Sequence, residues 1–282
     1  MKPFLTLFFL LAFTFGYSQQ DPQWSNYMYN QIGYNAGVAG AKYKLQSTAS
    51  FRRQWVGFGD APITAMLSTD AKIEKLHGGI GGLMMYNQLG NEKNLAAKLG
   101  YAYHLGVGPG TLQVGFNGEF QHKTLENQWI STHPNDPAIP TETSGSVFDA
   151  GFGTLFHTPK LQLGFGITHL FESAYQDLNI EGSRHYYLHG GYRYDFNDNF
   201  GLEPTFLVKS DRVSTQLDLT LRAHILDFLS LGFGYRKDDA YVLMLGYEGD
   251  NIRFGYAYDI ITSDISNYAP NSHEFLVSFL IQ

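Results

Sequence analysis

Two histidines, His185 and His189, have a spacing that is familiar from metal sites. On a helix, residues four apart share one face and can bind one ion. The surrounding residues predict a strand, on which the two histidines would lie roughly 13 Å apart at about 3.3 Å per residue. That distance is too large for one shared metal ion. The chain also has no cysteine. The sequence therefore predicts no metal site, no thiolate ligand and no disulfide.

Other residue types that could support catalysis lack the required setting. Glycine pairs at residues 151/153, 164/166 and 232/234 lie inside alternating strand patterns rather than before a helix, so they do not predict phosphate loops. Small residues there would leave room for a segment in the lumen or allow strong curvature. Ser146 and His157 are expected at opposite ends of one strand. We expect no enzymatic activity and no cofactor, although spacing alone leaves a spatial triad open.

Strands must position these residues, and residues 147–170 show the clearest hairpin. Its two arms alternate between apolar residues and glycines, amides or Asp149, and Pro159 lies between the arms. A period of two indicates strands with one apolar face. Each arm is about ten residues long, which is enough for a tilted strand to cross a bilayer. The hairpin fits a transmembrane barrel, and taken alone it also fits a soluble antiparallel sheet.

The composition favours the membrane alternative. Of 282 residues, 31 are glycine and 16% are aromatic, whereas only 16% are charged, below the usual quarter of soluble domains. The net charge of -7 argues against a nucleic-acid partner. Residues 1–18 resemble a secretory signal peptide, with Lys2, an apolar core over 4–15 and a small-residue site at Ser18. We expect the mature chain to begin at Gln19 and to reside in the outer membrane of a two-membrane bacterium.

The predicted fold is all-β: a transmembrane antiparallel β-barrel of about 14 strands with an N-terminal periplasmic or lumenal segment. We divide the chain into a signal peptide (1–18), a periplasmic or plug segment (19–41) and an outer-membrane β-barrel (42–282). The expected strands are 43–53, 62–72, 79–87, 95–105, 111–122, 147–158, 161–171, 185–196, 202–209, 215–225, 229–237, 240–247, 252–259 and 274–281. With the N-terminus in the periplasm, the long connections fall outside, as in known barrels.

Charged residues of both signs are expected to face the barrel interior, where they would form ion pairs. The candidates are Lys98, Glu119, Asp149, Arg193, Asp195, Glu203, Lys209, Asp218, Arg222, Arg236, Arg253 and Asp259. A selectivity filter would concentrate one sign instead.

Three groups of residues resemble a known family, the PorP/SprF membrane proteins of the type IX secretion system. The first comprises Asp21-Pro22-Gln23, Tyr27-Met28, Asn30-Gln31, Asn35 and Ala39-Gly40. The second comprises Arg53-Gln54-Trp55, Gly57, Gly59, Ala61-Pro62 and Thr64, and the third comprises Tyr258-Asp259, Ser266 and His273-Glu274. The resemblance spans the mature chain and is most specific at its N-terminal end.

The resemblance implies a non-enzymatic barrel that serves export, retention or surface attachment of secreted proteins, including adhesins of gliding motility. The implied partners are outer-membrane lipid, a secreted protein with a C-terminal sorting domain, and a periplasmic lipoprotein or peptidoglycan-linking component. The alternative is a small-solute channel, similar to porins or fatty-acid transporters, which would need a continuous open lumen.

The N-terminal signature and the end of the first strand are the expected partner-binding region, since the predicted topology places the N-terminal segment on the periplasmic side. The candidate residues are Asp21, Pro22, Gln23, Tyr27, Asn30, Asn35, Arg53 and Trp55. Two structural roles remain open for them. The polar and aromatic residues of the segment could fill the lumen, and Arg53 and Trp55 could anchor the barrel at the membrane interface.

Overall fold

The computed structural model describes residues 21–126, 142–178, 180–226 and 228–282. The expected signal peptide lies outside these ranges. Within them, no helix has the length and hydropathy of a membrane span. The helical elements are six short 3-10 turns: η1 (Tyr27–Tyr29), η2 (Gln31–Gly33), η3 (Ala36–Val38), η4 (Glu74–Leu76), η5 (Gln176–Leu178) and η6 (Asp264–Asn267).

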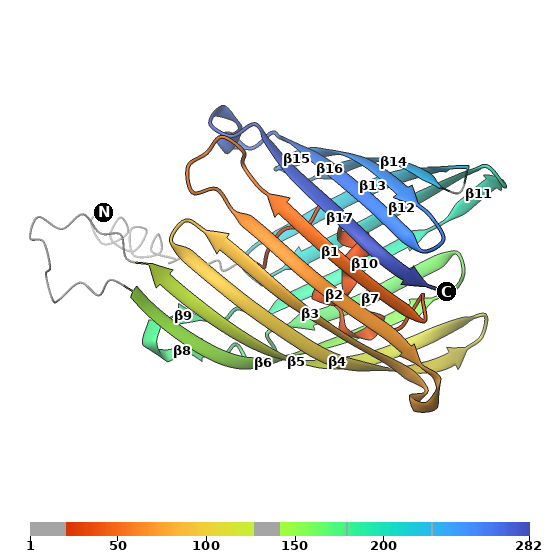
Figure 1. Ribbon diagram of the computed structural model, residues 1–282, viewed down its shortest axis with the longest axis horizontal. Coiled ribbons are helices and arrows are strands. Elements are labelled where there is room, and N and C mark those ends of the chain that lie inside the picture. Colours follow the sequence, from red (N-terminus) through yellow and green to blue (C-terminus); the bar gives the residue numbers. More distant parts are fainter. Residues whose placement is uncertain (1–20, 127–141, 179, 227) are drawn as a thin grey trace, which may run out of the picture.

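Antiparallel strands form one closed barrel (Figure 1). They are β1 (Leu45–Arg53), β2 (Ile63–Ile73), β3 (Gly78–Leu89), β4 (Glu92–Val107), β5 (Gly110–Glu126), β6 (Glu142–His157), β7 (Leu161–Thr168), β10 (His185–Tyr192), β11 (Tyr194–Asn197), β12 (Phe200–Ser210), β13 (Thr215–Ile225), β14 (Leu229–Arg236), β15 (Ala240–Glu248), β16 (Ile252–Ile261) and β17 (Asn271–Ile281). Since β10 and β11 both pair with β12 and are separated only by Arg193, they count as one strand, and the barrel has fourteen. Pairing of β1 with β17 and of β10 with both β7 and β12 leaves no open edge.

All fourteen predicted strands are confirmed, with differences at their ends. Strands β4, β5 and β6 extend several residues further than expected toward one end of the barrel. The expected strand 185–196 is interrupted at Arg193. A two-stranded sheet, β8 (Ala174–Tyr175) with β9 (Ile180–Glu181), lies in the connection between β7 and β10.

The two ends of the barrel differ in their connections. One end carries residues 54–62, 169–184 and 262–270, together with shorter turns at 90–91, 211–214 and 237–239. The other carries turns at 74–77, 108–109, 158–160, 198–199 and 249–251 and the last strand residue, Ile281. We call them the long-loop end and the short-turn end.

Side chains alternate between the outer surface and the lumen, as predicted. Phe148 is 75% exposed, whereas the next residue, Asp149, is 7% exposed. Aromatic rings pair across strands on the outside, with Phe120 and Phe148 opposite each other in register and 5.1 Å apart between ring centroids. Buried lysine, arginine, aspartate and glutamate side chains point inward. Of the predicted inward charges, Asp195 differs: it is exposed at the short-turn rim, where it pairs with Arg193.

The outward alternation predicts a cost that depends on depth in the bilayer. Leu219 is exposed near the middle of β13, and Val107 is exposed at the last residue of β4. We expect Leu219→Arg to lower the free energy of unfolding by about 2–4 kcal/mol, and Val107→Arg by about 0–1 kcal/mol, because only the first places a cation at the bilayer centre. Urea unfolding in lipid vesicles, followed by tryptophan fluorescence, measures both. Equal costs at the two positions would contradict the outward assignment of these side chains.

Candidate functional site: a lumen segment between two cavities

Residues 21–41 run through the inside of the barrel from the long-loop end to the short-turn end. Asp21 contacts Thr168 and His169, at the end of β7 nearest the 169–184 connection. Gly40 N donates to Asp70 Oδ2 at 2.9 Å, near the opposite end. Between them, Trp24, Tyr27, Met28, Ile32 and Tyr34 form one apolar cluster with inward residues of the wall. The main hydrophobic core of this barrel is therefore inside its lumen, and Figure 1 shows the segment enclosed by strands.

A buried charge network attaches the start of the segment to the wall. Ser25 Oγ donates to Asp259 and accepts from Arg52 Nη1 at 2.9 Å and from Arg236 Nη2 at 3.0 Å. Arg52 also forms ion pairs with Asp259 (2.7 Å) and Glu274 (3.3 Å). The side chains of Arg52, Asp259 and Glu274 are at most 1% exposed. Charges so deeply buried require partners, and here a serine of the segment completes the set.

Backbone groups of the segment also bind this network. The N–H groups of Ser25 and Asn26 donate to the two oxygens of Glu274 at 2.7 and 2.9 Å. A carboxylate that accepts two backbone N–H groups gives strong, directional hydrogen bonds. The segment is thus held by its backbone as well as by its side chains.

Asn35 fixes the middle of the segment. Its Nδ2 donates to the carbonyl oxygen of Thr154 at 2.9 Å and lies 2.8 Å from His189 Nε2. Its Oδ1 accepts from Gly37 N at 2.8 Å, which caps η3. The side chain is completely buried. Asparagine suits this place because it presents a donor group and an acceptor group on one short side chain.

Close approach of the segment requires glycine in the wall. A Cβ built on Gly153 of β6 would overlap Asn35 Oδ1 and lie 2.7 Å from the Ala36 nitrogen. A Cβ on Gly166 of β7 would overlap the carbonyl oxygen of Tyr34. Gly153 and Gly166, one from each of two glycine pairs, therefore form part of the surface against which η3 and its preceding turn pack.

The structure separates the predicted partner-binding residues into three locations. Tyr27, Asn30 and Asn35 are buried in the lumen; Tyr27 Oη hydrogen-bonds with Thr205, and Asn30 Oδ1 accepts from Ser50. Asp21, Pro22 and Gln23 are half-buried at the long-loop end, whereas the predicted topology associated the N-terminal segment with the end that carries the short turns. The difference arises because the segment traverses the whole lumen before β1 begins.

Arg53 and Trp55 occupy the third location, outside the lumen at the long-loop rim. Arg53 is exposed, and Trp55 is half-buried with a left-handed φ of 53°. The backbone N–H of Trp55 donates to Ser272 Oγ at 3.0 Å. The sequence pattern grouped these two residues with the N-terminal signature, but the fold does not bring them into the lumen.

Two cavities lie on opposite sides of the segment, and they share no lining residue. Tyr27, Asn30 and Tyr34 line the cavity at the long-loop end, of about 220 Å³. Met28, Tyr29 and Ile32 line the cavity at the short-turn end, of about 730 Å³. Neighbouring residues of η1 and η2 thus face opposite ways, and we call this stretch between the two cavities the partition.

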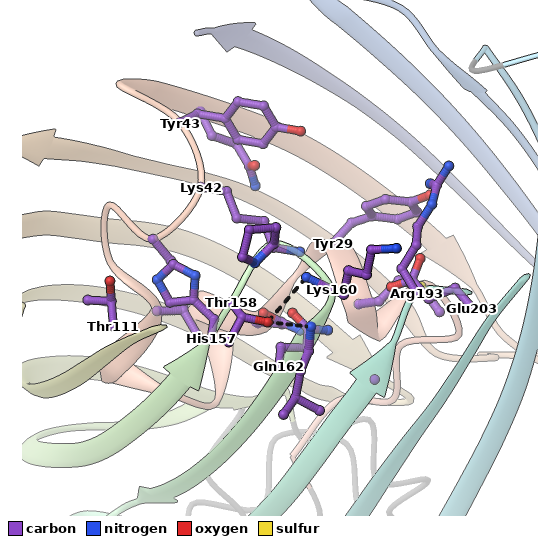
Figure 2. Close-up of a pocket in the computed structure, with 18 of the residues that line it drawn as sticks. Tyr29, Lys42, Tyr43, Thr111, His157, Thr158, Lys160, Gln162, Arg193 and Glu203 are labelled. Atoms are coloured by element: carbon purple, nitrogen blue, oxygen red, sulfur yellow. Dashed lines mark hydrogen bonds between the residues drawn. The ribbon is translucent and has the colours of Figure 1, made fainter. Parts of the chain in front are cut away.

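The larger cavity is predominantly cationic (Figure 2). Its lining includes five lysines or arginines (Lys42, Lys160, Arg193, Arg222 and Arg253) against three carboxylates (Asp70, Glu203 and Glu248). Arg222 pairs with Glu203 at 2.6 Å. Lys42 differs, since among the described residues no carboxylate lies within 4 Å of its Nζ.

Tyr29 lines this cavity beside two arginines. The guanidinium groups of Arg222 and Arg253 lie 4.9 and 4.6 Å from its ring centroid, which is cation–π geometry. Its hydroxyl donates to Glu248 at 2.7 Å.

The smaller cavity contains an acid and two histidines. His169 Nε2 lies 2.9 Å from Asp21 Oδ1, and His185 Nε2 lies 3.4 Å from the Asp21 nitrogen. Burial alone would raise the pKa of the Asp21 carboxyl, but His185 and His169 outweigh that effect and hold this pKa well below its usual value. The pKa of His169 is lowered by burial and raised more strongly by Asp21, so it lies above its ordinary value.

Sequence reasoning missed this cluster because its members are far apart in the chain. It considered His185 with His189 instead, and those two contact different groups: His189 contacts Asn35, and His185 contacts Ser183 and Asp21. It also missed a contact of Ser146 Oγ with His122 Nδ1 at 2.8 Å, on two adjoining strands at the long-loop end. In antiparallel strands such partners are set by register, which the sequence did not provide.

The buried network predicts a large asymmetry between two adjacent arginines. We expect Arg52→Met to lower the free energy of unfolding by about 3–5 kcal/mol, because it leaves Asp259 and Glu274 with one cation fewer. Arg53→Met, on the exposed face of the same strand, should change it by no more than about 0.5 kcal/mol. Denaturant titration in detergent micelles compares them. Adding Glu274→Gln to Arg52→Met should recover part of the loss, and no recovery would argue against charge burial as its cause.

Comparison with known proteins agrees with the barrel architecture. The outer membrane protein Omp33 of Acinetobacter baumannii has 6% identity and a TM-score of 0.50, over 86% of this chain and 100% of that chain. The KdgM porin in complex with disordered oligogalacturonate has 9% identity and a TM-score of 0.42, over 84% and 99%. The monoaromatic hydrocarbon channel TodX, as its deltaS2 mutant, has 11% identity and a TM-score of 0.47, over 88% and 92%.

The likeness to Omp33 supports the fold alone, that of an outer-membrane barrel. No curated protein matches the sequence. The family described as "Type IX secretion system membrane protein PorP/SprF" matches residues 16–279, which is nearly the whole chain. The chain therefore belongs to the PorP/SprF family of type IX secretion system membrane proteins and folds as an outer-membrane β-barrel.

Proposed function

We propose that this barrel is a non-enzymatic scaffold, with its lumen blocked by residues 21–41. The observation that carries the proposal is the partition formed by η1 and η2, whose residues face two cavities with no lining residue in common. A solute channel needs one continuous aqueous path. A scaffold needs rigid surfaces at both ends, and the buried Arg52–Asp259 network makes the lumen rigid.

The scaffold serves export or surface attachment of secreted proteins that carry a C-terminal sorting domain, with gliding-motility adhesins as one class of cargo. Family membership supports this role. By the usual rule for bacterial barrels, the short-turn end faces the periplasm and the long-loop end faces outward. Cargo then meets the long-loop end, where Asp21, Pro22 and Gln23 lie beside the longer connections.

A periplasmic lipoprotein or peptidoglycan-linking component binds at the short-turn end. The cationic cavity of Figure 2 supports this contact, because Lys42, Arg193 and the turn at 158–160 with Lys160 line it together. An acidic segment of a partner would pair there with Lys42, whose Nζ has no carboxylate of the described residues within 4 Å.

Ion currents distinguish the scaffold from the alternative small-solute channel. In planar bilayers, we expect no steady current through the wild-type protein. Gly153→Val should produce currents, because its side chain would occupy the space of Asn35 and displace η3, while valine favours the strand itself. Gly118→Val, in adjoining β5, is the control, since a Cβ there has no neighbour within 4 Å. Steady currents through the wild-type protein would favour the channel.

Surface display of cargo tests the scaffold role in cells. Removal of this chain should deplete sorting-domain proteins from the cell surface, and wild-type protein should restore them. Lys42→Glu should restore about tenfold less, equivalent to about 1.4 kcal/mol of lost partner binding, since it reverses a charge in the lining of the cavity. Lys75→Glu, exposed in the turn between β2 and β3, should restore fully. Surface protease digestion of intact cells measures the cargo, and undiminished cargo without this chain would refute the role.

A further inference from the structure

Three potential metal ligands meet in the smaller cavity from three separate parts of the fold. Asp21 belongs to the lumen segment, His169 to the connection after β7, and His185 begins β10. One ligand atom of each lies within 4.8 Å of the other two, and no other group of three among the described residues meets this limit. In a tetrahedral zinc site with bonds of about 2.0–2.2 Å, ligand atoms lie about 3.3 Å apart. Shifts of about 1 Å would therefore suffice.

We propose that Asp21, His169 and His185 bind one divalent zinc ion and that this ion attaches the start of the lumen segment to the barrel wall. Two imidazoles and one carboxylate are a donor set that suits zinc, and water would take the fourth position. The site is independent of the scaffold role proposed above.

His185 is already in the tautomer that a metal requires. Its Nδ1 lies 2.9 Å from the carbonyl oxygen of Ser183, an atom that only accepts hydrogen bonds. Nδ1 therefore carries the proton, and the lone pair of Nε2 lies beside Asp21, whose backbone N–H donates to it over a long contact of 3.4 Å. A backbone carbonyl on the distal ring nitrogen is the usual partner of a metal-binding histidine. The side chain is 1% exposed, so bulk water does not compete for that lone pair.

Asp21 is oriented by its second carboxylate oxygen. Tyr187 Oη and Thr168 Oγ1 both donate to Oδ2, the latter at 3.1 Å. Oδ1 is thereby directed toward His169. Hydrogen bonds of this kind fix ligating carboxylates in metal sites and are part of the design of such sites.

His169 has an acceptor available on its distal side. Its Nδ1 lies 3.7 Å from Glu119 Oε2 and 3.3 Å from Gln121 Nε2. Zinc on Nε2 would leave the ring proton of His169 on Nδ1, which faces the Glu119 carboxylate. That order of groups is the carboxylate–histidine–metal arrangement of many zinc sites. Glu119 also forms an ion pair with Lys98 at 3.1 Å.

The cavity also contains two lysines, whose positive charges reduce its affinity for zinc. Lys98 pairs with Glu119, and Lys209 Nζ lies 3.2 Å from the Asp21 carbonyl oxygen. Both are turned toward other acceptors than Asp21 Oδ1, so they leave the ligand atoms accessible. The simpler alternative is an ion pair between Asp21 and protonated His169 that binds no metal, and a direct binding measurement distinguishes the two.

The test uses the full mature protein, without a histidine tag, folded in detergent micelles and dialysed against buffered Zn²⁺. We expect one zinc ion per chain by mass spectrometry of the metal. His169→Ala and His185→Ala should each weaken binding about 100-fold or more, since loss of even an outer-shell partner costs about 10–100-fold. His157→Ala, which lines the larger cavity instead, is the matched control and should bind as the wild type does.

A second measurement uses the wild-type protein alone, so it does not require that the variants fold. Co²⁺ added to the wild-type protein should give the intense visible absorption of a four-coordinate site, and stoichiometric Zn²⁺ should abolish it. Absence of saturable Zn²⁺ binding to the wild-type protein would overturn the proposal. Unchanged binding in folded His169→Ala and His185→Ala proteins would overturn it equally, because the ion would then bind elsewhere.

Discussion

The structure depends on the pairing of charges inside a closed barrel. Fourteen strands enclose a lumen wider than that of an eight-stranded barrel, whose interior wall side chains can fill. The wall directs Arg52, Arg236, Asp259 and Glu274 into this lumen. Each of these charges would be costly in a dry interior without partners. The lumen segment supplies the missing groups: the Ser25 hydroxyl binds three of them, and two backbone N–H groups satisfy Glu274. The segment and the wall are therefore one polar network.

Steric fit complements this electrostatic attachment. Glycines within strands weaken a sheet, because they contribute no side chain and lose much backbone entropy. Here Gly153 and Gly166 face the segment at the places where its backbone comes closest. The local cost to the sheet is offset by the hydrogen bonds of Asn35 and by the stacking of Tyr34 on Tyr187, whose ring centroids are 5.1 Å apart. Charge pairs hold the start of the segment, and close backbone contact holds its middle.

The sequence predicted the wall far better than the contents of the lumen. In the strands, as at Phe148 and Asp149, the alternation of apolar and polar residues indicates which face of the sheet a side chain occupies. Recognising this alternation requires only neighbouring residues of the sequence. The extensions of β4 and β5 lack this alternation, since residues 92–94 and 124–126 are all of intermediate burial, and this is why the sequence predicted these strands too short. The path of residues 21–41 has no period, so nothing local indicated that it enters at the long-loop end. The same limit applies to Asp21 and His169, which meet only because the barrel closes around the segment.

The partition also gives the two cavities a physical connection. Tyr27 and Tyr34 face one cavity, and Met28 and Tyr29 face the other, yet all four belong to a single stretch of eight residues. A ligand in one cavity that binds better to one position of this stretch shifts the stretch toward that position. The shift changes the affinity of the other cavity for its own ligand, and the effect is reciprocal. Its size is set by how far η1 and η2 can move. Since Ser25 is fixed before them and Asn35 after them, the structure confines any such coupling to the residues between these two attachments.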